Sequence, residues 1–86
     1  MAKYDPLLEH LCRAGDEPID MPFEEIDHLV GGLPASAQRY LAWWSNETEG
    51  THVQARSWIN AGREVTDIDL AARRVTFSRP TWRRGS

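Results

Sequence analysis

The chain has 86 residues and a mass of 9.8 kDa, which is enough for one small domain and too little for two. Hydrophobic residues make up 41% of the chain and charged residues 27%, a balance that excludes an intrinsically disordered protein. A single cysteine excludes an internal disulfide and a cysteine-based metal cage. No apolar run is long enough to span a membrane, and the opening residues lack the pattern of a secretory signal, so we expect a cytoplasmic protein.

Periodicity and breaker residues predict four helices, one short strand and one hairpin. In chain order we expect a helix from Asp5-Pro6 to Gly15, an extended segment over 18–23, a helix from Phe23 to Gly31-Gly32, a helix from Ala35 to Trp44, a helix from His52 to Ala61 and a hairpin from Val65 to Phe77. Pro22 makes the extended segment an edge strand, because proline cannot donate to a central ladder. The spacing of Val65, Ile68 and Leu70 breaks strict alternation and predicts a bulge near Thr66–Asp67.

The apolar positions predict the core. On the first helix we expect Cys12 to be a small buried hydrophobe beside Leu7, Leu8 and Leu11. Leu41 and Trp44 fall on one face of the third helix, and Val53 and Trp58 on one face of the fourth. We expect Trp43, Trp44 and Trp58 to serve the core of so small a domain rather than to form platforms for stacked bases.

These elements predict an α+β domain. It would occupy residues 1–79, followed by a flexible arginine-rich tail over 80–86. Two helices joined by the turn Gly31 to Pro34 and followed by a hairpin favour a winged-helix-like arrangement, which the additional fourth helix does not fit in its simplest form.

Charge is distributed unevenly along the chain. Residues 1–37 carry two basic and eight acidic residues, a net charge of −6, whereas residues 38–86 carry eight arginines and five acidic residues, a net charge of +3. This asymmetry predicts either a face suited to a polyanion or two halves of the surface that attract each other. The overall pI of about 5.5 is low for a nucleic-acid-binding protein.

Motifs along nearly the whole chain are similar to those of a widespread uncharacterised family of small bacterial proteins. The similarity is carried by Lys3-Tyr4-Asp5-Pro6-Leu7, Phe23-Glu24-Glu25-Ile26, Gly31, Leu33-Pro34, Ser36-Ala37, Trp43-Trp44, Asn46, Gln54-Ala55, Trp58, Ala61-Gly62, Val65, Asp69-Leu70, Val75, Phe77 and Arg79. The resemblance implies a short stand-alone protein and invites a nucleic-acid-binding role. Pro22 stands where members often have Ser or Thr, and Arg63 stands where an aromatic residue often follows Gly62.

The sequence does not favour an enzyme. Cys12 lies on an apolar stripe, and His10, His28 and His52 lie on three different elements, so no triad or metal-binding pair is formed by spacing. No glycine-rich phosphate loop is present. We therefore expect no catalytic residue, no metal and no cofactor.

A polar strip on the third and fourth helices is the best candidate for function. We predict a nucleic-acid interface, with DNA the favoured partner, formed by Ser36, Gln38, Arg39, Asn46, His52, Gln54, Arg56, Arg63, Arg73 and Arg74. Asn and Gln can read adenine edges, and arginines at the hairpin turn would hold phosphates. The structural alternatives are that Asn46 caps the third helix, that Gln54 bonds a loop carbonyl and that Arg56 pairs with Glu47 or Glu49.

The rival hypothesis is a protein-interaction module or a homodimeric adaptor. The acidic residues Glu24, Glu25 and Asp27 would repel DNA and attract a basic partner. In a homodimer the acidic first half of one chain would face the arginine-rich second half of the other.

Overall fold

The computed structural model describes residues 3–15, 17–46 and 53–79, and within them it forms a mixed α+β fold. The elements in chain order are α1 (Asp5–Arg13), β1 (Ile19–Pro22), α2 (Phe23–Val30), α3 (Ala35–Arg39), the 3₁₀ helix η1 (Leu41–Trp44), α4 (Ala55–Ile59), β2 (Glu64–Asp69) and β3 (Arg74–Ser78). None of the helices in these ranges could cross a membrane, since α1, the longest of them, has nine residues.

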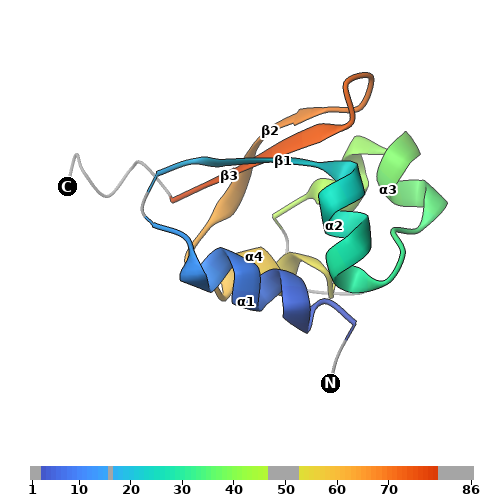
Figure 1. The fold of residues 1–86 in the computed structure, drawn as a ribbon. Coiled ribbons are helices and arrows are strands. Elements are labelled where there is room, and N and C mark those ends of the chain that lie inside the picture. Colours follow the sequence, from blue (N-terminus) through green and yellow to red (C-terminus); the bar gives the residue numbers. More distant parts are fainter. Residues whose placement is uncertain (1–2, 16, 47–52, 80–86) are drawn as a thin grey trace.

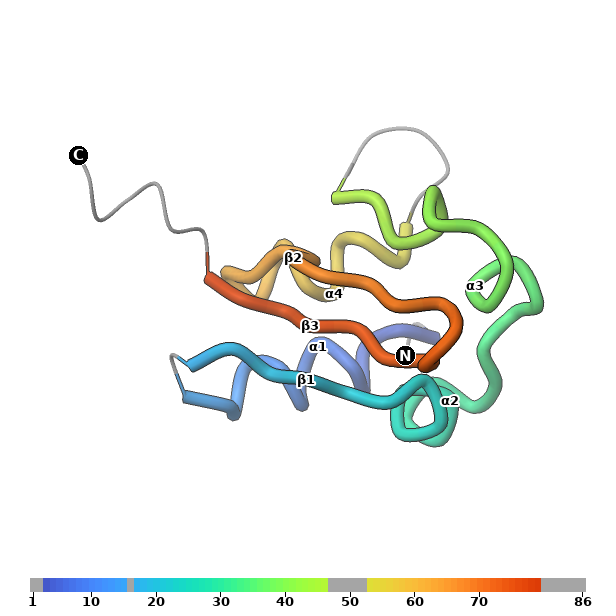
Figure 2. Tube along the Cα trace, turned by 90° about the horizontal axis from the view of Figure 1, so that it is seen from above, coloured from blue at the N-terminus to red at the C-terminus, as the bar shows by residue number. Residues whose placement is uncertain are grey.

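The three strands form one antiparallel sheet in the order β1-β3-β2 (Figure 2). The predicted edge position of the first strand is confirmed, because β1 pairs with β3 alone. The predicted bulge is confirmed as well. Val65 pairs with Phe77 and Asp67 with Thr76, so Thr66 is the extra residue. The bulge lets Val65 and Ile68, three positions apart, face the same side of the sheet.

The helices cover one face of this sheet. Figures 1 and 2 show α1 and α4 side by side beneath it, with α2 at the end of β1 and α3 beyond the hairpin turn. The strand register places polar side chains on the opposite face, where Asp20 pairs across from Thr76, and Asp69 from Arg74. Sheets of this kind bury one face and expose the other, which explains the alternation along β1 and β3.

Aromatic rings connect the two layers. Phe23 of α2 stacks on Trp44 of η1 with 5.0 Å between ring centroids, and Trp44 lies 5.9 Å from Trp58 of α4. Trp58 in turn lies 5.4 Å from Phe77 of β3. All four rings are buried, so the prediction that Trp44 and Trp58 belong to the core is confirmed. Trp43 is only half-buried and contacts Tyr4 edge-on.

The expected helix over 35–44 is interrupted. Tyr40 has extended backbone angles (φ −124°, ψ 124°), which end α3 and start the 3₁₀ turn of η1. The Trp44 indole Nε1 donates to the Ala37 carbonyl at 2.7 Å. In a continuous helix these residues would lie about 10 Å apart along the axis, so this bond requires the chain to turn back.

Four local predictions are wrong, each for its own reason. Cys12 is exposed, because Leu7 and Leu11 alone complete the buried stripe of α1. Leu41 is 59% exposed, because the break at Tyr40 rotates it away from the core. Val53 is 54% exposed and precedes α4, which spans only Ala55–Ile59. α1 ends at Arg13 through the extended Ala14 rather than at Gly15.

The aromatic core predicts unequal effects at two neighbouring tryptophans. Trp44→Phe removes a buried indole and its bond to Ala37, and we expect the free energy of unfolding to fall by about 2–3 kcal/mol. Trp43→Phe, the matched change at a half-buried ring, should cost about 1 kcal/mol or less. Urea denaturation followed by circular dichroism measures both, and equal losses would contradict this account of the core.

Candidate functional site

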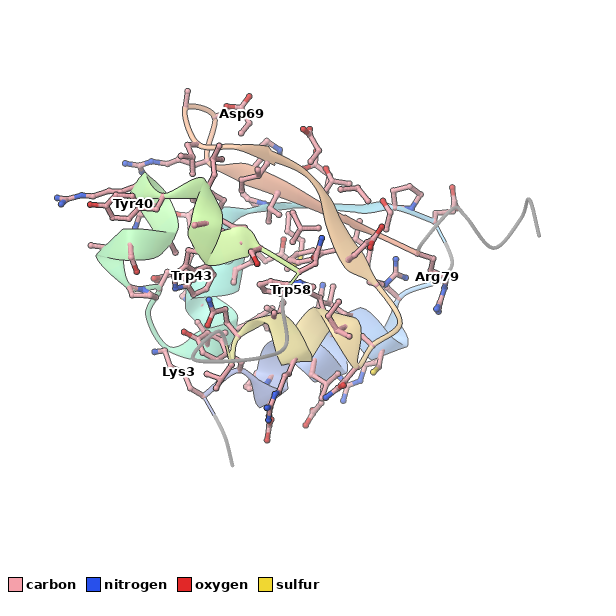
Figure 3. All side chains as sticks on the ribbon, turned by 180° about the vertical axis from the view of Figure 1, so that it is seen from behind. Lys3, Tyr40, Trp43, Trp58, Asp69 and Arg79 are labelled. Carbon is pink, nitrogen blue, oxygen red and sulfur yellow. The ribbon has the colours of Figure 1, made fainter. Side chains whose placement is uncertain are left out.

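Three of the polar residues predicted to form one interface line two different pockets. Gln38 and Arg73 line a pocket at the hairpin end of the molecule, whereas Arg56 lines a second pocket between α1 and α4. In Figure 3, Lys3 of the second pocket lies on the side of the molecule away from the hairpin end, where Asp69 is labelled. The predicted strip from the third helix into the fourth is therefore not a continuous surface.

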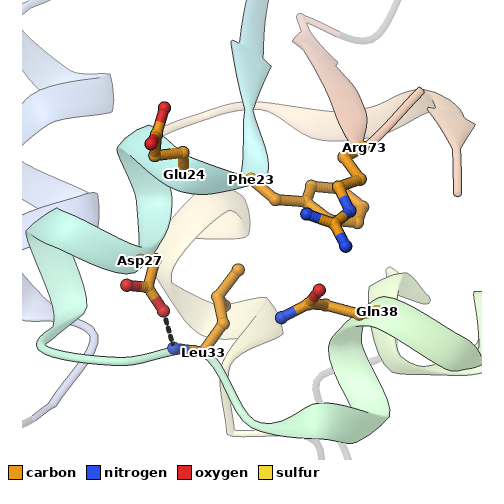
Figure 4. Close-up of a pocket in the computed structure, with 6 residues that line it drawn as sticks. All are labelled: Phe23, Glu24, Asp27, Leu33, Gln38 and Arg73. Atoms are coloured by element: carbon orange, nitrogen blue, oxygen red, sulfur yellow. Dashed lines mark hydrogen bonds between the residues drawn. The ribbon is translucent and has the colours of Figure 1, made fainter. Parts of the chain in front are cut away.

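The first pocket, which we call the hairpin pocket, has a volume of about 420 Å³ and is open to solvent. Its lining residues are Phe23, Glu24, Asp27, Leu33, Gln38 and Arg73 (Figure 4). They come from α2, the turn after α2, α3 and the β2–β3 turn. One cation, one amide, two carboxylates and an apolar floor are therefore gathered from four segments.

Two hydrogen bonds hold the shape of the hairpin pocket. Arg73 is the one described residue other than glycine with a left-handed backbone (φ 59°), and its carbonyl accepts a 2.8 Å bond from the Phe23 amide. Asp27 Oδ1 accepts a 2.6 Å bond from the Leu33 amide, which fixes the turn between α2 and α3. A left-handed conformation is costly for arginine, so this tertiary bond must help to maintain it.

The second pocket, the α4 pocket, has a volume of about 480 Å³. Its lining residues are Lys3, Tyr4, Asp5, Leu8, Val53, Arg56, Ser57 and Asn60. Arg56 and Asn60 are exposed and lie four residues apart at α4 and its C-cap, with Lys3 across the pocket. Partial burial raises the pKa of the Tyr4 hydroxyl above its ordinary value, so this group stays neutral at physiological pH.

Asn46 and Gln54 both serve the fold. Gln54 bonds a backbone carbonyl, as its structural alternative proposed, whereas Asn46 bonds α4 and β2 instead of capping the third helix. The Asn46 side chain accepts from Trp58 Nε1 at 3.0 Å and from the Val65 amide at 2.8 Å, and it donates to the Val65 carbonyl at 3.1 Å. Gln54 is buried and donates to the Trp43 carbonyl at 2.9 Å. These contacts occupy the amide groups that a base would otherwise meet.

Arg63 is not part of an exposed basic face. Its side chain is 1% exposed and donates to the carbonyls of Glu17 (3.1 Å) and Gly15. The guanidinium thus joins the start of the hairpin to the segment between α1 and β1. Carbonyl oxygens give a buried guanidinium the hydrogen bonds that it loses in leaving water.

Other arginines lie on separate elements of the described chain. Arg74 Nε lies 3.1 Å from Asp20 Oδ1 across the open face of the sheet, and Arg13 Nη2 lies 3.8 Å from Glu9 Oε1. Arg39, Arg56 and Arg73 have no ion-pair partner within the described ranges. They lie on α3, α4 and the hairpin turn, so the available positive charge is divided between separate sites.

The other site predictions have simpler outcomes. Ser36 is half-buried on α3, while Gln38 and Arg39 are exposed there. His52 and the proposed Arg56 partners, Glu47 and Glu49, lie outside the described residues, as does the segment 80–86. Over residues 3–15, 17–46 and 53–79, no group of three His, Cys, Asp or Glu side chains is placed to hold a metal ion.

Sequence reasoning missed several lining residues. Lys3 and Asn60 line the α4 pocket together with Arg56, and Asp27 lines the hairpin pocket. The spacing of Arg56 and Asn60, one helical turn apart, was an available signal for a shared face. The approach of Lys3 to that face had no such signal, because it depends on how α1 packs against α4.

Comparison with known families shows to which family the chain belongs. A family model described as a domain of unknown function, DUF7662, matches residues 4–81. The chain belongs to this family. Neither the curated proteins nor the solved structures gave a match.

Burial of Arg63 predicts a structural cost that an exposed arginine would not show. Arg63→Ala leaves the Gly15 and Glu17 carbonyls without their donors, and we expect the free energy of unfolding to fall by about 2–4 kcal/mol. The same change at exposed Arg56 should cost about 0.5 kcal/mol or less. Chemical denaturation of the two variants measures the difference, and a neutral Arg63→Ala would disprove the structural role.

Proposed function

We propose that this domain binds nucleic acid, with DNA the favoured partner, through the α4 pocket. The observation that supports it is the placement of Arg56 and Asn60 one turn apart on the exposed side of α4, with Lys3 across the same pocket. Arg56 has no carboxylate partner among the described residues and is available to a ligand.

The chemistry of these side chains suits a nucleic acid. An arginine fork bonds guanine or a phosphate, an asparagine amide bonds adenine, and a lysine holds a phosphate as a point charge. Leu8 and Val53 line the same pocket and offer apolar contact to a base or a thymine methyl group. The α4 pocket therefore combines phosphate contacts with the means to distinguish bases.

The order of the elements adds support. A winged helix-turn-helix has a pair of helices followed by a β-hairpin, and here α2, α3 and then α4 precede the β2–β3 hairpin. In helix-turn-helix proteins the second helix of the pair enters the major groove. The turn Gly31 to Pro34 joins α2 and α3, so α4 lies outside that pair; the proposed complex uses α4 because it is the helix directly before the hairpin.

The charge distribution limits the strength of the proposed binding. Lys3 and Arg56 offer two phosphate contacts, whereas Arg63 is buried and Arg74 is paired with Asp20. Two contacts correspond to a slope of about −1.8 for the logarithm of the binding constant against the logarithm of salt concentration. We therefore propose that the domain binds DNA with modest affinity.

Fluorescence anisotropy with a labelled short duplex at low and physiological salt tests this function. The wild type should show a slope of about −2, and Arg56→Gln should reduce its magnitude by about 1. Arg13→Gln is the matched control. It removes the same charge at the end of α1, about 12 Å along the helix axis from Asp5, which lines the α4 pocket. Absence of binding at low salt, or equal effects of the two variants, would overturn the proposal.

A second candidate function, self-association, rests on a different surface. Tyr40 and Leu41 are consecutive and 60% and 59% exposed, and Arg39 precedes them. Tyrosine and arginine are enriched in the residues that dominate protein interfaces. The acidic first turns of α2, with Glu24 and Glu25, supply a complementary charge on a second copy of this chain, so the partner proposed for this surface is an identical chain.

Light scattering during size-exclusion chromatography tests the second candidate. At low salt the wild type should have twice the monomer mass, and Tyr40→Ser with Leu41→Ser should restore the monomer. Val53→Ser is the control, since Val53 is similarly exposed and lies at the α4 pocket instead. A monomeric wild type, or dissociation caused equally by Val53→Ser, would reject self-association through this surface. The outcome is independent of duplex binding.

A further inference from the structure

The hairpin pocket carries a chemistry that does not suit a polyanion. Glu24 and Asp27 bring two carboxylates from α2 to the pocket that Arg73 lines from the hairpin turn. A phosphate backbone would meet both carboxylates on its way to Arg73. A ligand matched to this pocket must therefore carry charges of both signs.

The charges lie on different walls. Figure 4 shows Asp27 on the α2 side, Arg73 on the hairpin side and Gln38 approaching from α3. No ion pair joins Arg73 to Asp27 or Glu24 within the described part of the chain. A molecule that lies between the two walls can therefore contact charges of both signs.

The groups between the charged walls suit a peptide unit. A glutamine amide both donates and accepts, as a peptide bond does, so Gln38 can pair with one. Leu33 and the largely buried Phe23 give the pocket an apolar floor for a side chain. The volume of about 420 Å³ lies within the range of small-molecule sites.

The strained backbone at Arg73 is a second feature that favours a ligand site in the hairpin pocket. Arginine holds a left-handed conformation that glycine adopts without strain, and the Phe23 amide fixes its carbonyl. Strained residues of this kind cluster at ligand-binding sites, where the surrounding structure maintains them. A glycine at position 73 would adopt this turn without strain, but the hairpin pocket would then lack its guanidinium.

We infer that the hairpin pocket binds a zwitterion of dipeptide size. The ligand carboxylate contacts Arg73, its peptide group pairs with Gln38, and its ammonium group lies toward Asp27 and Glu24. The inference concerns a different pocket from the proposed nucleic-acid surface, and it stands or falls separately from it.

Titration with alanyl-leucine, followed by ¹⁵N-edited NMR of the full chain, tests this site. The amide of Leu33, the side-chain amide of Gln38 and the Nε–H of Arg73 should shift in a saturable manner. N-acetyl-alanyl-leucine, which lacks the ammonium, and alanyl-leucine amide, which lacks the carboxylate, should each bind about tenfold more weakly. Absence of saturable shifts in these three groups would overturn the inference, as would undiminished binding of either blocked peptide.

Arg73→Gly separates binding from folding. Glycine accepts the left-handed turn, so the melting temperature should be unchanged or higher, while affinity for alanyl-leucine falls about tenfold. Arg13→Gln removes the same charge far from the pocket and should leave the affinity unchanged. Equal affinity in wild type and Arg73→Gly would exclude Arg73 as the carboxylate partner and overturn the inference.

Discussion

Burial of a continuous aromatic stack is the constraint on which this fold depends. A chain of this length can bury only a modest fraction of its surface, so a few large side chains must supply most of the apolar contact. Phe23, Trp44, Trp58 and Phe77 do so by linking α2, η1, α4 and β3 through successive ring contacts. The break at Tyr40 is a consequence, because it turns Trp44 back into the stack and leaves Tyr40 outside.

The same shortage of core explains how the polar residues are used. Asn46 holds the Trp58 indole and both backbone groups of Val65, and Gln54 holds the Trp43 carbonyl. Arg63 closes the gap between the start of the hairpin and the segment after α1. These contacts satisfy polar groups at the margin of so thin a core. Residue types that read bases in a nucleic-acid interface here complete the fold.

The polar residues that remain on the surface line two pockets that differ in charge. The α4 pocket is lined by two cations, Lys3 and Arg56, and one carboxylate, Asp5, whereas the hairpin pocket has one cation, Arg73, and two carboxylates from α2. The open face of the sheet is polar, and its Arg74 is paired with Asp20. The described arginines of the second half, over 53–79, therefore do not gather on one face, because the chain crosses between layers several times. This division is why the proposed ligands of the two pockets differ in charge.

By itself the sequence determined the α+β class, the edge position of β1, the bulge in β2, the stop of α2 at Gly31 and the burial of Trp44 and Trp58. Each of these follows from local rules, such as the missing amide of Pro22, the left-handed preference of glycine or the size of an indole ring. Tertiary structure alone decided which polar residues stay available to a partner. Asn46, Gln54 and Arg63 are bound by carbonyls, amides and an indole distant in sequence, while Lys3 and Arg56 line one pocket only because α1 packs against α4. Such contacts depend on how the layers stack, and no periodicity or local motif in the chain encodes that arrangement.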